Sequence, residues 1–454
     1  MANVIKLRKG LDINLQGKAE EKKIQLKSNG KFALVPDDFE GVTPKVVVKE
    51  GDHVKAGDAL FVNKQYPEIK LASPVSGTVR EVVRGERRKV LCVKVDADAQ
   101  QEFTDFGKKD VGSMTGEQVI NALLEAGLFG YINQLPYAVS TNPSVMPKAI
   151  FVSALRDKPL AADFQYEAKG QEQDFVTGIQ ALSKIAKTYV GLGIQPDFQT
   201  VIRQLGIDNF AELNIFDGKC PAGNVGVQVN NVDPVNKGEV VWTIGDPTVV
   251  LFIGRLLNTG KVNLTRTVAL CGSEIKSPAY VDMLVGEELS TLLSNSYDAS
   301  HSVRIINGNV LTGMPTTKDG YLGAHTSEIT VIPEGDQADE FLGWILPRFK
   351  QFSVNRSYFS WLCGKKDYAL DARVKGGERH MIMSGEYDRV LPMDIYGEYL
   401  IKAIIAGDID RQEALGIYEV SPEDFALAEF VDSSKLELQR IVREGLNILR
   451  KENA

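Results

Sequence analysis

The residue types that most often carry redox or metal chemistry are few in this chain and stand far apart. Its cysteines are Cys92, Cys220, Cys271 and Cys363, and its histidines are His53, His301, His325 and His380. A zinc site or an iron–sulfur cluster needs several such ligands at short spacings, as in C-x-x-C. No two of these residues have that spacing, so we expect neither a metal site nor a local catalytic constellation.

Two glycine-rich stretches invite comparison with phosphate-binding loops. Gly191-Leu-Gly-Ile-Gln-Pro196 begins like G-x-G-x-x-G, but proline stands where the third glycine is required. The glycines of residues 216–226 fit neither that fingerprint nor a P-loop. The residues favour a structural turn at 216–226, and neither stretch gives support for a nucleotide or flavin site.

A third stretch concentrates aromatic side chains around one cation. It contains Phe349, Phe352, Arg356, Tyr358, Phe359 and Trp361. A quinone needs an apolar cleft with a few polar groups that hold its carbonyls, which this set can supply. The alternative is that the rings pack a core or a subunit interface and that Arg356 pairs with a carboxylate.

Composition restricts the remaining function classes. The 454 residues carry a formal net charge of −8, which argues against nucleic-acid binding. No apolar run approaches the roughly 18 residues of a membrane helix, and the first residues lack the apolar core of a signal peptide. We expect a cytoplasmic chain of about three domains from its length, able to bind peripherally to a membrane complex.

The elements that must position these residues begin with short strands broken by turns between residues 46 and 95. Gly51-Asp52, Gly57-Asp58 and residues 73–77 (Ser-Pro-Val-Ser-Gly) are the turns. Their order resembles the barrel-sandwich of biotinyl and lipoyl carrier domains. Those carriers attach their cofactor to a lysine at a hairpin tip, where this chain has Gln65-Tyr-Pro67, with Lys64 out of context. The resemblance therefore implies the barrel without a covalently bound cofactor.

Residues 146–260 alternate strands with helices. We expect strands at 149–154, 187–191 and 213–216, and helices at 174–186, 198–205 and 249–257, the last after Asp246-Pro247. Such alternation is typical of a parallel, Rossmann-like sheet. A β-rich stretch with one short helix follows at 261–335 and resembles the soluble-ligand-binding β-grasp (SLBB) domain. Residues 336–454 predict a C-terminal helical domain.

The predicted fold class is therefore multidomain α/β. A barrel-sandwich domain at 1–103 precedes a helical linker at 104–145, and the Rossmann-like, β-grasp and helical domains follow. That order resembles the A subunits of Na+-translocating NADH:quinone reductases over nearly the whole chain. Supporting stretches include residues 9–12 (Lys-Gly-Leu-Asp), Pro221-Ala-Gly223 and residues 352–357 (Phe-Ser-Val-Asn-Arg-Ser). Cys220 departs from the histidine expected before Pro-Ala-Gly, so we assign no chemistry there.

The resemblance implies a peripheral subunit on the cytoplasmic side of the bacterial inner membrane. Its partners would be other subunits, mainly membrane ones, that together transfer electrons from NADH to ubiquinone and export Na+. NADH and flavins would be used in those other subunits, and ubiquinone would contact Phe352, Arg356, Tyr358 and Trp361. Two alternatives stay open: a flavin- and NADH-binding subunit of an Rnf-like electron-transfer complex, or a degenerate biotinyl-type carrier.

Overall fold

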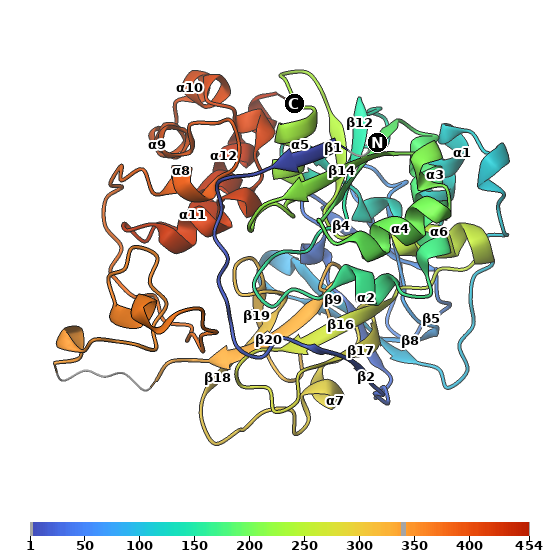
Figure 1. Ribbon diagram of the computed structural model, residues 1–454. Coiled ribbons are helices and arrows are strands. Elements are labelled where there is room, and N and C mark those ends of the chain that lie inside the picture. The colour runs from blue at the N-terminus through green and yellow to red at the C-terminus, as the bar shows by residue number, and fades with distance from the viewer. Residues whose placement is uncertain (1–2, 337–341, 454) are drawn as a thin grey trace.

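The computed structural model describes residues 3–336 and 342–453, which form four sheets and a group of C-terminal helices (Figure 1). Two small sheets face each other as a barrel-sandwich. One contains β3 (Lys31–Leu34), β9 (Val90–Ala97), β8 (Gly77–Arg84) and β5 (His53–Val54); the other contains β4 (Pro44–Val46), β6 (Ala59–Asn63) and β7 (Lys70–Ala72). The aliphatic residues that alternate along these strands fill the space between the sheets.

The central sheet has the strand order β1-β14-β13-β12-β15-β10-β11. These strands are Asn3–Lys6, Glu212–Asp217, Lys187–Leu192, Ala149–Ser153, Val241–Ile244, Asn133–Leu135 and Val139–Ser140. The first five run parallel, and β10 and β11 are antiparallel. From β12 the chain proceeds outward to β13 and β14, and then returns to β15 on the other side of β12. This is the Rossmann-type arrangement, and its switch point lies between β12 and β15.

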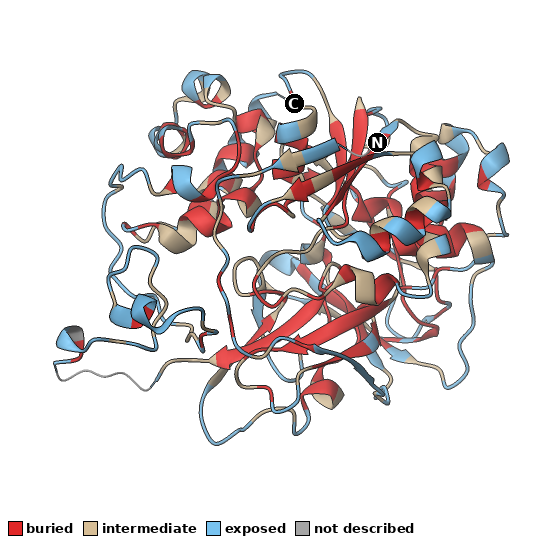
Figure 2. Ribbon diagram, in the orientation of Figure 1, coloured by how far each residue is buried: buried red, intermediate tan, exposed pale blue. Residues whose placement is uncertain are grey.

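Helices cover both faces of this sheet because β12 is apolar except for Ser153 and buries every residue. Ile150 and Val152 face a core shared with α3 (Glu172–Ser183) and α6 (Thr248–Thr259), whereas Phe151 faces α5 (Val225–Val232). The remaining helices of this part are α1 (Gly116–Glu125), α2 (Phe164–Ala168) and α4 (Pro196–Gln204). Figure 2 shows the buried strands between the helices.

The β-grasp part is a mixed sheet of order β19-β18-β20-β16-β17-β2. Its strands are Met314–Thr316, Val303–Asn307, Glu328–Pro333, Thr265–Cys271, Ala279–Leu284 and Glu20–Ile24, with the short helix α7 at Ser290–Leu293. The C-terminal part contains α8 (Tyr387–Val390), α9 (Gly397–Ala406), α10 (Ile409–Ala414), α11 (Ala426–Val431) and α12 (Leu438–Glu452). The stripe of Leu438, Val442, Leu446 and Leu449 on α12 is buried in the core of this helical part.

The first 24 residues cross the limits of these parts. Strand β1 pairs with β14 of the central sheet, and β2 pairs with β17 of the β-grasp sheet. Between them the chain runs along the molecule as one extended segment, which Figure 1 shows in dark blue. Residues 133–140, expected within a helical linker, supply two strands of the central sheet. The domain limits expected from the sequence remain a prediction, and these pairings join the parts across them.

Candidate functional site

The switch point between β12 and β15 opens into a cleft of about 500 Å³. In open α/β sheets, ligands bind at this place, outside the carboxyl ends of the strands. Leu155 and Arg156 follow β12, and Gly245 and Asp246 follow β15, so the ends of both strands line the cleft. Residues from the barrel, the β-grasp sheet and the C-terminal helices complete its walls.

A buried group of charges holds one wall of this cleft. Arg156 donates from Nη1 to Glu167 Oε2 over 2.7 Å and from Nη2 to Asp246 Oδ1 over 2.8 Å. Arg266 of β16, with no exposed surface, donates from Nη2 to Asp246 Oδ2 over 2.9 Å and from Nη1 to the Ala324 carbonyl over 2.7 Å. Burial alone would raise the pKa of Asp246, but the guanidiniums of Arg266 and Arg156 hold that pKa well below its usual range. The carboxylate is therefore an ionised partner of two arginines and is unsuited to proton transfer.

Asp38 of the barrel and His325 of the β-grasp part also lie beside this group of charges. Asp38 Oδ2 accepts a hydrogen bond of 2.8 Å from the Ala324 backbone N–H, and His325 Nδ1 lies 4.0 Å from Asp246 Oδ2. Burial lowers the pKa of His325, with partial compensation from Asp246, so the imidazole is neutral near pH 7. The cluster ties three parts of the molecule together. Sequence reasoning missed it, although a charged residue within three positions of the end of each of two buried strands was a usable signal.

Protein side chains fill the space beside the two glycines that were compared with phosphate-binding loops. A Cβ on Gly191 would lie 2.0 Å from Gln228 Oε1, because the Gln228 side chain from α5 covers the end of strand β13 and donates to Ser153 Oγ. In the 216–226 segment the Gly223 N–H donates to Asp157 Oδ2 over 2.8 Å. The turn expected in the 216–226 segment is present at residues 220–223, whereas Gly191 lies within strand β13 and not in a turn. Burial raises the pKa of the Cys220 thiol, which is 2% exposed and therefore unsuited to nucleophilic chemistry.

The hairpin tip of the barrel is docked on the neighbouring part. Tyr66 OH accepts a hydrogen bond of 3.2 Å from Asn142 Nδ2, and within the barrel the Lys64 N–H donates to the Thr43 carbonyl over 2.7 Å. A carrier needs a tip that moves between active sites, whereas this tip is held at its centre.

The predicted quinone residues divide between two environments. Phe352 and Tyr358 line a cleft of about 520 Å³ at the junction of the β-grasp sheet, the C-terminal helices and the N-terminal segment. The Phe352 ring packs edge-on against Tyr368 at 5.5 Å between centroids and lies 5.9 Å from Phe430. Other apolar lining residues include Ile13, Leu15, Ile306, Val310, Leu311, Ile332, Val354, Leu370 and Leu436.

Arg356 and Trp361 do not line this cleft. Both are exposed, and the Arg356 guanidinium lies 5.1 Å from the centroid of the Trp361 ring. Phe349 and Phe359 are likewise about half exposed, with their centroids 6.2 Å apart. The structure therefore brings Phe352 and Tyr358 together and leaves the other four residues on the surface.

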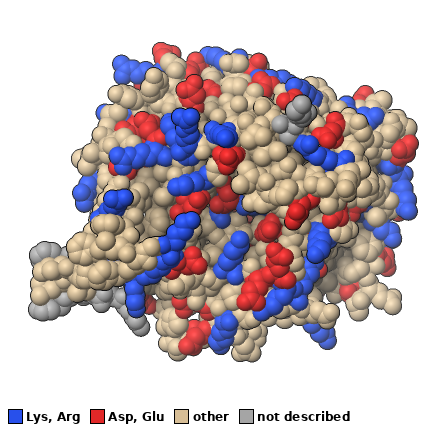
Figure 3. Space-filling model, viewed as in Figure 1, with Lys and Arg blue, Asp and Glu red and all other residues tan. Residues whose placement is uncertain are grey.

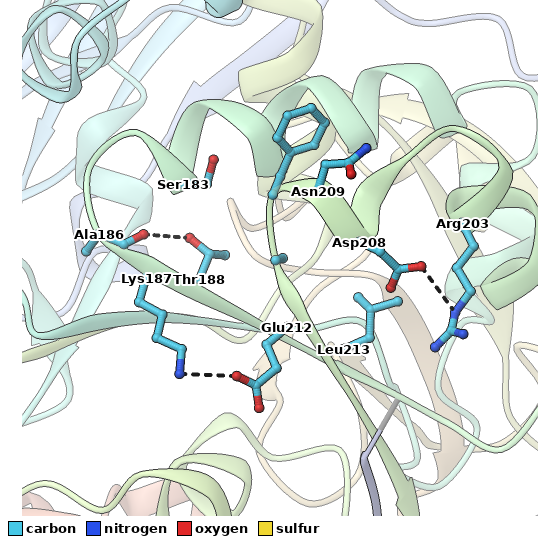
Figure 4. Close-up of a pocket in the computed structure, with 11 residues that line it drawn as sticks. Ser183, Ala186, Lys187, Thr188, Arg203, Asp208, Asn209, Glu212 and Leu213 are labelled. Atoms are coloured by element: carbon cyan, nitrogen blue, oxygen red, sulfur yellow. Dashed lines mark hydrogen bonds and ion pairs between the residues drawn. The ribbon is translucent and has the colours of Figure 1, made fainter. Parts of the chain in front are cut away.

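A further hollow lies at the opposite edge of the central sheet, at the amino ends of β13 and β14 (Figure 4). Its charged side chains pair with one another: Lys187 Nζ lies 3.1 Å from Glu212 Oε2, and Arg203 Nε lies 4.0 Å from Asp208 Oδ2. Ligands of α/β sheets bind at the other edge, so this hollow is not the candidate site.

Two general features concern metals and membranes. Across residues 3–336 and 342–453, no three His, Cys, Asp or Glu side chains converge as a metal site would require. Within the same ranges, none of the helices has the length and hydropathy needed to cross a bilayer.

Comparison with known proteins gives the same order of parts. Three family models match: the NqrA N-terminal barrel-sandwich hybrid domain over residues 5–98, the NqrA second alpha/beta domain over 114–262, and the NQRA C-terminal domain over 267–318. Curated relatives extend the match to 99% of this chain and 100% of their own length. They are the A subunits of the Na(+)-translocating NADH-quinone reductases of Yersinia pestis bv. Antiqua (32% identical), Haemophilus influenzae PittGG (33%) and Histophilus somni 2336 (34%). The barrel-sandwich, the α/β sheet and the SLBB part thus occur in the family's order, and the chain belongs to the NqrA family, the A subunits of Na+-translocating NADH-quinone reductases.

Proposed function

We propose that this chain is a peripheral subunit on the cytoplasmic side of the membrane and takes part in the quinone-reduction step and in assembly of the complex. The relatives are named as one subunit of an NADH-quinone reductase, which implies further subunits as partners. NADH and flavin chemistry belongs to those subunits, mainly membrane ones, and this chain contributes a binding surface for ubiquinone and no catalytic residue. Alone it has no turnover.

The observation that carries the quinone proposal is the cleft around Phe352 and Tyr358. Its volume of about 520 Å³ falls within the range of small-molecule sites, and its walls are mainly aliphatic and aromatic. Gln351 lies at its lining and offers an amide donor for a quinone carbonyl, whereas Arg304, also at the lining, is paired with Glu334. Phe352 and Tyr358 are the ring contacts in this proposal, while Arg356 and Trp361 belong to the exposed surface outside the cleft.

The test is made on the assembled, detergent-solubilised complex. Phe352→Ala removes one ring from the cleft and is expected to raise the KM for ubiquinone about tenfold, which corresponds to about 1.4 kcal/mol. Reduction of an artificial electron acceptor by NADH should remain at the wild-type rate, because that step does not use this cleft. Photolabelling with an azido-quinone, followed by peptide mapping, should mark peptides that line the cleft.

Tyr399→Ala is the matched control, because Tyr399 lies 57% exposed on α9, outside the cleft. It should leave the KM for ubiquinone unchanged. An unaltered KM in Phe352→Ala, together with photolabel found only on other subunits, would refute quinone binding at this cleft.

A flavin- or NADH-binding role in an Rnf-like complex has weaker support. The turn after β12, residues 154–158 (Ala-Leu-Arg-Asp-Lys), contains no glycine to admit a pyrophosphate. Arg156 is already committed to Glu167 and Asp246. A degenerate carrier is less supported still, since the hairpin tip is docked through Tyr66.

A further inference from the structure

The segment between Leu342 and Leu362 exposes large apolar side chains on one projecting part of the molecule. Eight of them are at least 39% exposed: Leu342, Ile345, Leu346, Phe349, Val354, Phe359, Trp361 and Leu362. Figure 3 shows the projection on the left, largely uncharged, with Lys and Arg side chains beside it. Scattered exposed apolar residues are ordinary in soluble proteins, but a run of this density marks an interaction surface.

Hydrogen bonds hold parts of this segment together as one surface. The Phe359 N–H donates to the Pro347 carbonyl over 3.1 Å, and Lys366 Nζ donates to the Phe349 carbonyl over 2.9 Å. These contacts bring the Phe349 and Phe359 rings side by side, with centroids 6.2 Å apart. We call residues 342–382 the basic apolar surface.

The charge of the basic apolar surface is opposite to that of the chain as a whole. Residues 342–382 contain eight Lys or Arg and three Asp or Glu, a net charge of +5, in a chain of net charge −8. Among the described residues, no carboxylate oxygen lies within 4 Å of the charged groups of Lys350, Arg356 and Lys365, which occupy no ion pair. These cations are therefore available to an anionic partner.

We propose that the basic apolar surface docks on the anionic headgroups of a lipid bilayer. The apolar side chains would lie below the headgroups and the cations at the phosphates, as in other interfacial segments. Half of the cations are lysines (Lys350, Lys365, Lys366 and Lys375), and lysine is depleted in protein–protein interfaces. The other half are arginines, which such interfaces favour, so the assignment to lipid rests on charge: the net charge of +5 is complementary to anionic headgroups. The inference rests on the peripheral membrane location proposed for this chain and is independent of quinone binding.

The experiment measures cosedimentation of the purified full-length chain with vesicles. Vesicles of phosphatidylethanolamine with about 30% phosphatidylglycerol are compared with vesicles of phosphatidylcholine alone. We expect at least tenfold tighter binding to the anionic vesicles and release of most of the protein at high salt, where exposed charges are screened. No quinone is present, so failure of this assay leaves the quinone proposal standing, and the converse also holds.

Two double variants address the two components of the surface. Lys350→Glu with Lys365→Glu should weaken binding to the anionic vesicles at least tenfold, because two attractions become repulsions. Phe359→Ser with Trp361→Ser should reduce binding and leave a remainder that salt abolishes. All four side chains are exposed, so the thermal unfolding midpoint should match that of the wild type.

The control variants make the same kinds of substitution, charge reversal and loss of apolar side chains, outside residues 342–382. Lys49→Glu with Lys64→Glu makes an identical change in net charge, and Ile194→Ser with Ile405→Ser removes apolar side chains that are 58% and 55% exposed. Neither should alter vesicle binding. The proposal is overturned if wild-type protein ignores anionic vesicles, or if control and surface variants lose binding equally. Loss of assembly with the membrane subunits in lipid-free detergent, with vesicle binding intact, would assign the surface to a protein partner and also overturn it.

Discussion

At the scale of single residues, the switch-point cluster shows how burial and pairing decide what a charge does. Asp246 remains ionised because two guanidiniums contact it, 2.8 and 2.9 Å away. Asp38 has no such contact: burial raises its pKa from 3.8 to about 6, and the Ala324 N–H only partly offsets this. The Asp246 carboxylate holds the cluster together, whereas the ionised Asp38 carboxylate lowers the stability of the folded state near neutral pH.

We predict that Asp38→Asn stabilises the protein at high pH. The folded protein binds the Asp38 proton more tightly than the unfolded chain does, so stability falls as the pH rises from about 4 through about 6. Asparagine removes the buried charge and still offers an oxygen to the Ala324 N–H. The variant should unfold with a free energy about 2 kcal/mol higher at pH 8, and the gain should shrink as the pH approaches 4.

Urea unfolding of both proteins between pH 4.5 and 8 measures this difference. The control is Asp37→Asn, which removes an exposed ion pair with Lys89 and should cost at most about 1 kcal/mol. A gain in Asp38→Asn that is equal at all pH values would contradict the assignment of the cost to an ionised carboxylate.

At the scale of elements, local sequence patterns predicted those strands and helices whose formation depends mainly on their own residues. The strands expected at 149–154, 187–191 and 213–216 correspond to β12, β13 and β14, because runs of buried β-branched and aromatic residues suit a parallel sheet. Strand β15 and helix α5 were missed. Helix α5 follows a glycine-rich stretch that was interpreted only as a turn, and β15 is four residues long.

The same limit applies to the site. Phe352 and Tyr358 are six residues apart, but the walls they meet come from Ile13 and Ile306. Likewise Arg156, Asp246 and Arg266 converge only because three parts of the fold do. Spacing along a chain predicts contacts within a helix or a hairpin, whereas these contacts depend on tertiary packing.

The crossing of α3 and α6 gives a prediction at this scale. A Cβ on Gly254 of α6 would lie 1.8 Å from the Asp174 carbonyl oxygen, so the glycine sets how closely the helices approach. Alanine favours an exposed helix by about 1 kcal/mol, but here it must separate two packed helices. Gly254→Ala should therefore lower the free energy of unfolding by about 2 kcal/mol or more, measured by chemical denaturation.

Gly377→Ala is the control for this variant, because nothing lies within 4 Å of the added Cβ and the backbone there needs no positive φ. It should change stability by less than about 0.5 kcal/mol. Equal effects of the two substitutions would mean that the helix crossing does not depend on close approach.

At the scale of the whole molecule, the N-terminal segment is the connection that the sequence did not reveal. Its backbone bonds to the α/β part at Cys220, to residue Tyr368, and to the β-grasp part at Gly272. Ile13 and Leu15 are buried within the C-terminal core, at 5% and 9% exposure. A segment with contacts to three parts couples their unfolding, since none can separate without losing them.

We predict that deletion of residues 1–18 breaks this coupling. The variant loses the β1 strand and the burial of two large aliphatic side chains, together worth roughly 5 kcal/mol. The wild type should unfold in one calorimetric peak. In the variant the first thermal transition should fall by roughly 10 °C and the peak should split, because the β-grasp sheet no longer shares a segment with the α/β sheet. A synthetic peptide of residues 1–18, added in excess, should restore the midpoint, since it can bury Ile13 and Leu15 again and pair with β14. A deletion that leaves one peak at the wild-type temperature would show that the four parts hold together through their direct contacts, without a contribution from the segment.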